Sequence, residues 1–316
     1  DAATVTNNGV FTLTGDETIG ALQGGGTMNL TGATLSTGVT NTSTTFSGNA
    51  SGTGGLIKQG TGAFTLSGTN TYTGDTEVIN GTLVLSGGAA IADGAAMVVT
   101  GPGVLQVDTA ETVGSLNGSG DITLNATLTS GQAGFATTES GDISGAGGMT
   151  LAGTGWLTLS GNNTYAGLTT VESGALLTAA SNTALGSTAA GTVVAAGGTL
   201  ELTGGITTAE AITLNGTGEG AGGALRSASG ANTVTGAVTL ASGATIRTEA
   251  DLLTLSGGIT GTNTTLTVDG AGDTTIDSAI ATGTGGLTKD GAGELTLSGT
   301  NTFTGDLTIS DGTVSV

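Results

Sequence analysis

The sequence predicts an all-β chain, folded as a single continuous β-solenoid over residues 1–316. Three observations predict this fold class. A long motif recurs three times, apolar clusters return at nearly even steps, and signals for helices are almost absent. In a solenoid each coil packs only on its neighbours, so a chain can repeat itself at this scale without building a thick globular core.

The internal repeat is the strongest of the three observations. Each copy has a Gly-Gly-apolar opening, a strand of the type L-T-L-S-G, then N-T-aromatic-x-G and a final apolar segment. The copies cover 54–87, 147–180 and 285–316. Their spacing is unequal, as the equivalent asparagines Asn70, Asn163 and Asn301 show. A solenoid tolerates the insertion of whole coils between copies, because the added coils contact only the layers beside them.

The apolar clusters set the length of one coil. Leu66, Leu85, Leu105 and Leu124 follow one another at steps of 19, 20 and 19 residues. A step of this size fits one coil made of several short strands, so the chain would form about 16 coils. Within a strand, side chains alternate between two faces. We therefore expect Phe64 and Leu66 to point inward and the intervening Thr65 to point outward.

Composition excludes several classes of function. The chain has 63 Gly and one Pro, and aromatic residues make up 3%, which favours a thin aliphatic core. Four basic residues stand against 24 acidic ones, for a net charge of −20. Binding to nucleic acid or to anionic lipid needs clustered cations and is not expected. Cysteine is absent, and no apolar run approaches the length of a membrane span. We expect no membrane insertion by this chain, and we recognise no signal peptide.

The motif Asn-Thr-aromatic-x-Gly predicts a corner closed by a buried ring. Asparagine suits turn geometry and can bond to its own backbone. An alternative is that Tyr72 and Tyr165 stack on carbohydrate, although the third copy has Phe303 and so dispenses with the hydroxyl. Trp156 is interpreted as a local packing residue of the core or surface rather than as a platform for a ligand.

No catalytic, cofactor-binding or metal site is predicted. Without His or Cys, the usual charge-relay triads and zinc sites are excluded. The densest group of carboxylates is Asp269, Asp273 and Asp277, which as paired acids would suit polysaccharide cleavage or, as oxygen ligands, calcium. Few aromatic or basic residues accompany them, and the nonapeptide of calcium-binding β-rolls does not recur. The interpretation that we prefer is solvated turn residues.

Two of the repeat copies carry a family resemblance. The strings GTGGLIKQGTGAFTLSGTNTYTGDT and GTGGLTKDGAGELTLSGTNTFTGDL resemble the passenger-associated transport repeat of bacterial autotransporters. The segments ETIGALQGGGTMNL and ETVGSLNGSGDITL resemble the stretch that leads into it. The resemblance implies a right-handed parallel β-helix with three sheets per coil. It also implies export across the outer membrane to the cell surface or the extracellular space.

The expected function is structural and adhesive. The last residues, Gly312–Val316, match Gly81–Leu85 inside the first copy, and the N-terminal residues resemble the stretch after Leu85. One hypothesis is therefore head-to-tail stacking of copies into a filament, and the alternative is truncation of a longer passenger. The expected partners are the protein itself, side by side or end to end, with other cell-surface components as further candidates. A carbohydrate-active β-helix enzyme and an inert stalk are the alternatives.

Overall fold

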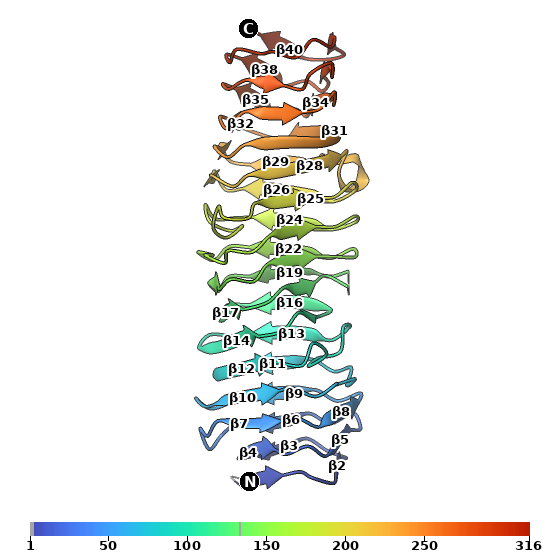
Figure 1. Cartoon of the computed structure of the whole chain (residues 1–316), viewed down its shortest axis with the longest axis vertical. Helices are drawn as coiled ribbons and strands as arrows, with labels where there is room; N and C mark the ends of the chain where they lie inside the picture. The colour runs from blue at the N-terminus through green and yellow to red at the C-terminus, as the bar shows by residue number, and fades with distance from the viewer. Residues whose placement is uncertain (1–2, 133) are drawn as a thin grey trace. The chain divides into compact units, whose positions relative to one another are not determined.

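The computed structural model describes residues 3–132 and 134–316 of the chain. The residues divide into two compact units, residues 1–150 and 151–316, and each unit is considered by itself. Both are built from short parallel strands that are laid turn upon turn (Figure 1). One short 3-10 helix, η1 (Glu219–Ala221), interrupts the strands described in the second unit.

The strands of the first unit are mostly three to five residues long. They are β1 (Thr4–Thr6), β2 (Val10–Leu13), β3 (Glu17–Ile19), β4 (Ala21–Gln23), β5 (Thr27–Leu30), β6 (Leu35–Thr37), β7 (Thr44–Phe46), β8 (Asn49–Gly52), β9 (Leu56–Lys58), β10 (Ala63–Leu66), β11 (Thr76–Val78), β12 (Gly81–Leu85), β13 (Ala96–Val99), β14 (Gly103–Val107), β15 (Glu111–Thr112), β16 (Ser115–Gly118), β17 (Asp121–Leu124), β18 (Leu128–Ser130), β19 (Ala136–Glu139) and β20 (Ile143–Ser144). Strand β21 (Met149–Leu151) spans the division between the units.

The strands of the second unit are similar, except for one of 11 residues. They are β22 (Trp156–Leu159), β23 (Thr169–Val171), β24 (Leu176–Ala179), β25 (Thr192–Val194), β26 (Thr199–Thr203), β27 (Thr207–Thr208), β28 (Ile212–Gly216), β29 (Leu225–Ser229), β30 (Asn232–Val234), β31 (Val238–Thr248), β32 (Leu252–Leu255), β33 (Ile259–Gly261), β34 (Leu266–Asp269), β35 (Asp273–Ile276), β36 (Ile280–Ala281), β37 (Leu287–Lys289), β38 (Glu294–Leu297), β39 (Leu307–Ile309) and β40 (Thr313–Ser315).

In the first unit, equivalent strands of successive turns pair in parallel. One ladder runs through β7, β10, β12, β14, β17 and β20, and another through β3, β6, β9, β11, β13 and β16. Register partners stack like on like, as in the buried column of Phe46, Leu66, Leu85, Val107 and Leu124. The core is thus a narrow pile of aliphatic side chains, each covered by the turn before and the turn after.

The second unit repeats this arrangement with one irregular turn. The ladder β27-β30-β32-β35-β38-β40 forms one face. The long strand β31 bends, so that Val238–Leu240 pairs with β28 and β33 while Ala244–Arg247 pairs with β34. The register between β28 and β31 shifts at Leu214 and Gly216. The two ends of this one strand therefore pair with different sets of strands.

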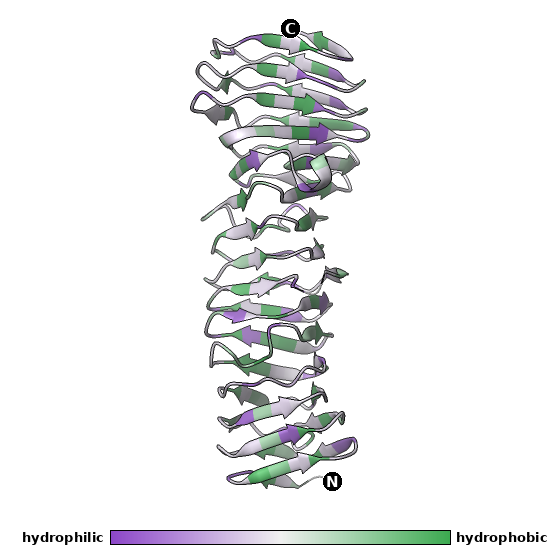
Figure 2. Cartoon of the chain, turned by 90° about the vertical axis from the view of Figure 1, so that its right-hand side faces the viewer, coloured by the Kyte–Doolittle hydropathy of each residue, from purple (hydrophilic) through white to green (hydrophobic). Residues whose placement is uncertain are grey.

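The alternation predicted from the sequence is confirmed. Phe64 and Leu66 are buried and Thr65 is partly exposed, and the pattern in β14 alternates through all five residues. Polar and apolar residues alternate along the strands in Figure 2. Threonine is suited to the outward positions, because its branched Cβ fits a pleated strand and its hydroxyl remains in water.

Glycine is required at some corners because adjacent turns touch backbone to backbone. A Cβ on Gly54 would lie 1.8 Å from the carbonyl oxygen of Ala33, and one on Gly74 would lie 2.5 Å from the carbonyl carbon of Gly54. Real Cβ atoms do not approach so closely. A Cβ on Gly55, the second glycine of the pair that opens the first repeat copy, would lie 2.7 Å from the carbonyl oxygen of Asp75, so both glycines are required by packing at the corner.

The predicted fold class is confirmed. The chain is all-β and forms a parallel β-solenoid of about 15 turns, close to the about 16 coils expected. The handedness, the number of sheets per coil and the continuity of one solenoid over residues 1–316 stay predictions.

Candidate functional site

A ladder of outward hydroxyls runs along one face of the second unit. Its members are register partners from turn to turn: Thr207, Thr233, Thr254, Thr275, Thr296 and Ser315. Adjacent strands of a sheet lie about 4.8 Å apart, so these hydroxyls recur at that spacing. The hydroxyls of Thr233, Thr254, Thr275 and Thr296 form no hydrogen bond to the described residues. We call this row the threonine ladder. Its four central hydroxyls are unused donors and acceptors, whereas the hydroxyl of Ser315 donates to Glu294.

A charged ladder crosses another face of the same unit. Glu201, Arg226, Arg247 and Asp269 are consecutive register partners on β26, β29, β31 and β34. An Arg226 nitrogen lies 2.6 Å from Glu201 Oε2, and Arg247 Nη1 lies 2.9 Å from Asp269 Oδ2. The two arginines are therefore neutralised by acids on their outer sides. Such partly exposed pairs contribute about 1 kcal/mol or less each.

The two lysines are internal, which leaves the arginines as the surface cations of the described chain. Lys58 and Lys289 are buried, and the ammonium of Lys58 donates to the carbonyl oxygens of Gln59, Gly60 and Asn80 at 2.6, 2.8 and 3.0 Å. Burial lowers the pKa of Lys58 to about 8. Lys289 binds the equivalent carbonyls of Asp290 and Gly291 in the third repeat copy. These lysines fasten corners and are not available to an external ligand.

The buried ring predicted for the aromatic corner is confirmed in the first two copies, whereas Phe303 of the third copy is only partly buried. The alternative that the two tyrosines stack on carbohydrate is wrong. Tyr72 and Tyr165 are both fully buried, so neither ring face is open to a sugar. Each hydroxyl bonds to a threonine four residues later, Tyr72 to Thr76 at 2.6 Å and Tyr165 to Thr169 at 2.7 Å. In the third copy both partners change, to Phe303 and Leu307. The pair therefore switches as a unit from polar to apolar.

The asparagines of the motif act between turns. Asn70 Oδ1 accepts the N–H of Ala50 at 2.7 Å, and its Nδ2 donates to Ala90 O at 2.8 Å. In the second copy Asn163 Nδ2 donates to Ala184 O at 2.7 Å. Asn70 thus bonds to the turns on both sides of its own. Only stacking of the turns brings these groups within reach, so the sequence could not show it.

The three aspartates of the candidate carboxylate cluster are engaged in local contacts. Asp269 pairs with Arg247 and accepts the N–H of Gly270, Asp273 accepts the N–H of Glu294, and Asp277 accepts the hydroxyl of Ser256. No group of three or more acids among the described residues is arranged to hold a metal ion. The interpretation as turn residues needs correction for two of them, because Asp269 ends β34 and Asp273 begins β35, on either side of the turn.

Sequence reasoning missed three buried glutamates. Glu111, Glu139 and Glu210 are at most 3% exposed. Burial raises the pKa of all three, for Glu139 and Glu210 to about 7. Two N–H groups, of Ala90 and Ile91, bond the Glu111 carboxylate at 3.0 Å each, whereas Glu139 Oε2 has no partner among the described residues. No constant spacing in the sequence marks these residues, since Glu111 follows Tyr72 by 39 residues and Glu210 follows Tyr165 by 45.

Trp156 opens β22 and is 49% exposed. In the repeat motif it occupies the position of Ala63 in the first copy and of Glu294 in the third, one residue before the position of Phe64. Of the two packing roles expected for it, in the core or at the surface, the structure places Trp156 at the surface. None of the helices among the described residues is long and apolar enough to span a membrane.

Comparison with known proteins finds a family of repeats that parts of this chain resemble. The model of the passenger-associated transport repeat matches this chain three times, at residues 56–85, 149–178 and 287–316. Together with the parallel β-solenoid, these repeats fit an autotransporter passenger domain. The chain is similar to the adhesin BmaC autotransporter of Brucella suis biovar 1 (strain 1330), with 34% identity over 208 residues. The match covers 64% of this chain and 6% of that protein. No solved structure matches the chain.

Proposed function

We propose that this chain is a non-enzymatic, extracellular adhesive segment that associates with copies of itself on the bacterial surface. The observation that carries the proposal is the threonine ladder, whose hydroxyls lie in register over successive turns. Its four central hydroxyls, from Thr233 to Thr296, form no hydrogen bond to the described residues. A second copy laid alongside would meet the same repeat at the same spacing. Many weak hydrogen bonds, each about 1 kcal/mol net, would then add along the ladder.

The comparisons support an adhesive role. The repeats are of the kind found in autotransporter passengers, and the relative is named an adhesin. The engagement of Asp269, Asp273 and Asp277 in local contacts supports a chain without catalytic function. Export across an outer membrane and display at the cell surface belong to the same proposal.

A variant in the threonine ladder tests the lateral contact. Replacing Thr233, Thr254, Thr275 and Thr296 by valine keeps the branched shape and removes four hydroxyls. We expect weaker self-association of the purified chain in sedimentation velocity, with unchanged circular dichroism. The matched control replaces the outward Thr123 and Thr158, which lie outside the ladder, by valine. Equal association of the ladder variant, the control and the parent chain would overturn the lateral contact.

Head-to-tail contact is a second mode of the same proposal. Leu307 and Ile309 of β39 are 43% and 52% exposed, whereas the residues at these positions in the first copy, Thr76 and Val78, are covered by the following turn. A further turn of the same polypeptide would cover them as well as a second copy would. Electron microscopy of the purified 316-residue chain distinguishes the modes, since end-to-end contact produces filaments and lateral contact produces bundles. Isolated single particles at high concentration would exclude both.

A further inference from the structure

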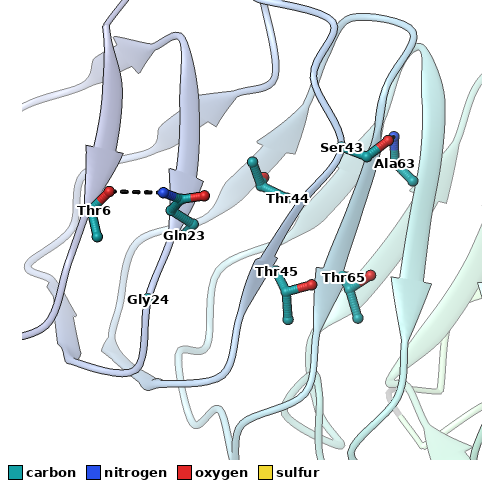
Figure 3. Close-up of a pocket in the computed structure, with 8 residues that line it drawn as sticks. All are labelled: Thr6, Gln23, Gly24, Ser43, Thr44, Thr45, Ala63 and Thr65. Carbon is teal, nitrogen blue, oxygen red and sulfur yellow. Dashed lines mark hydrogen bonds between the residues drawn. The ribbon is translucent and has the colours of Figure 1, made fainter.

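A groove on the first unit departs from the regular pairing of turns. It has a volume of about 480 Å³ and lies between β4 and β7. Thr6 and Gln23 line one side, and Ser43, Thr44, Thr45 and Thr65 line the other, as Figure 3 shows. Elsewhere along this face β7, β10 and β12 pair residue by residue. Between β4 and β7 the only bridge among the described residues is that of Gly24 to Phe46.

The groove has a defined structural cause. The two turns touch at both ends of the gap, where Thr40 N donates to Gly20 O and Gly24 N donates to Thr45 O, at 3.1 and 3.2 Å. Between these two hydrogen bonds, one turn runs from residue 20 to residue 24 and the next turn runs from residue 40 to residue 45. The second segment is therefore one residue longer than the first. The extra residue forms a bulge, and among the described residues this segment pairs with the preceding turn only through the bridge of Gly24 to Phe46.

Two side chains hold the bulge toward the following turn. Asn41 Oδ1 accepts the N–H of Thr61 at 2.8 Å, and Ser43 Oγ accepts the N–H of Ala63 at 3.1 Å. Asn41 itself has a φ of 61°, a conformation that asparagine adopts more readily than most residues. Both hydrogen bonds join residues of this unit, so the gap is part of its folded structure.

The lining is uncharged and rich in unused hydrogen-bonding groups. Gln23 Nε2 donates to Thr6 Oγ1 at 2.9 Å, which leaves the Gln23 carbonyl oxygen toward solvent. The hydroxyls of Thr44, Thr45 and Thr65 form no hydrogen bond to the described residues. Each hydroxyl both donates and accepts, so the groove suits a ligand whose own groups do the same.

These features select a class of ligand. A charged ligand would lose hydration without finding an opposite charge in the lining. An added β-strand needs a row of open main-chain groups about five residues long, and the closures at Gly20 and Gly24 are too close together for it. Neutral sugars carry hydroxyl groups and no charge, so their groups match those of this lining.

A smaller groove of about 350 Å³ in the second unit has the same ingredients. It is lined in part by Thr239, Thr260 and Thr262 and carries no charged side chain. Beside it Asn263, with a φ of 58°, accepts the N–H of Thr284 at 3.1 Å. A hydroxyl-lined gap beside a left-handed asparagine that bonds to the next turn thus occurs in each unit.

We propose that the groove between β4 and β7 binds one unit of a neutral saccharide through Gln23, Thr45 and Thr65. The site is distinct from the threonine ladder and does not depend on self-association. Since the lining includes no aromatic ring on which a sugar could stack, binding is weak, with a Kd of about 1 mM, equivalent to about 4 kcal/mol.

The test is a titration of the 316-residue chain, with its threonine methyl groups labelled, by NMR. The probes are glucose, galactose and N-acetylglucosamine, with glucuronate as the charged comparison. We expect saturable shifts at Thr44, Thr45 and Thr65 with at least one neutral sugar. The variant Thr45→Val/Thr65→Val should bind at least about tenfold more weakly, a change of about 1.4 kcal/mol. Thr123→Val, outside the groove, should bind as the parent does.

Several results would overturn the proposal. The absence of saturable shifts in the groove with all three neutral sugars would exclude the site. Equal binding by the double variant and the parent would show that these hydroxyls are not the ligands. Binding of glucuronate as tight as that of the neutral sugars would refute the assigned class. Methyl spectra that match the parent outside the groove establish that the double variant is folded.

Discussion

At the scale of the residue, a single buried carboxyl group makes the stability of the protein depend on pH. Glu210 is 2% exposed, and its carboxylate accepts a hydrogen bond from Thr192 at 3.3 Å. Burial raises the pKa of Glu210 from 4.5 to about 7. A carboxyl group whose pKa is higher in the folded state contributes stability that is present below the unfolded pKa. That stability is lost as the pH rises through the folded value.

Glu210→Gln should therefore flatten the dependence of stability on pH. The neutral amide has the shape of the protonated acid, so the variant should gain up to about 3 kcal/mol over the parent at about pH 8 and little at about pH 4. Urea midpoints at the two pH values measure this. Exposed Glu172, replaced in the same way, is the control. A parent chain that becomes more stable between about pH 5 and pH 7 through this residue would contradict the assignment.

The buried pair of Tyr72 and Thr76 gives a second prediction at this scale. Tyr72→Phe leaves the buried Thr76 hydroxyl without its partner and should cost about 1–3 kcal/mol. Tyr72→Phe/Thr76→Val removes both polar groups, as Phe303 and Leu307 do in the third copy, and should recover most of the loss. A double-mutant cycle on urea midpoints measures the coupling. Additive losses would mean that the hydroxyls do not act as a pair.

At the scale of the element, the corner between strands decides whether turns can stack. Gly54 lies before β9 against the carbonyl oxygen of Ala33. Period-two alternation alone predicts the strands and their inward residues, as at Phe64 and Leu66. Alternation does not predict the hydrogen-bond partners of Asn70, Lys58 and Glu111. Each of these residues bonds to a turn about 20 residues away or to a corner whose path depends on how the turns stack.

Gly54→Ala should destabilise the first unit by about 2 kcal/mol or more. The new methyl group would meet main-chain atoms at 1.8 Å, and the whole corner must move to admit it. Gly15→Ala is the matched control, since its Cβ has no atom within 4 Å. Thermal unfolding of both variants measures the difference. Equal midpoints for the two would show that the corner tolerates a side chain.

At the scale of the whole molecule, charge controls association. The chain carries a net charge of −20, and its two lysines are buried at corners between strands. Like-charged copies repel one another at low ionic strength. Raising sodium chloride from about 10 mM to about 150 mM shortens the screening length from about 30 Å to about 8 Å, so repulsion between approaching copies falls.

Self-association through uncharged ladders should therefore increase with salt, and with divalent cations as well. Light scattering of the purified chain across a sodium chloride series measures it. The ladder variant Thr233→Val/Thr254→Val/Thr275→Val/Thr296→Val serves as the comparison and should respond less. Association that weakens as salt rises would indicate contact through opposite charges instead, with the ladder Glu201-Arg226-Arg247-Asp269 as the first region to examine.

The sequence by itself determined the β-solenoid, the inward and outward faces of its strands, the three repeat copies and the resemblance to autotransporter passengers. These follow from local alternation and from the spacing of like residues, which the chain displays in order. Only the tertiary structure decided that Tyr72 is sealed inside, that Asn70 joins three turns, and that a longer path at 40–45 opens a groove beside Gln23. The physical reason is that these features depend on how one turn is offset against the next. That offset is set by the packing of side chains and backbone at every corner, which the sequence does not display.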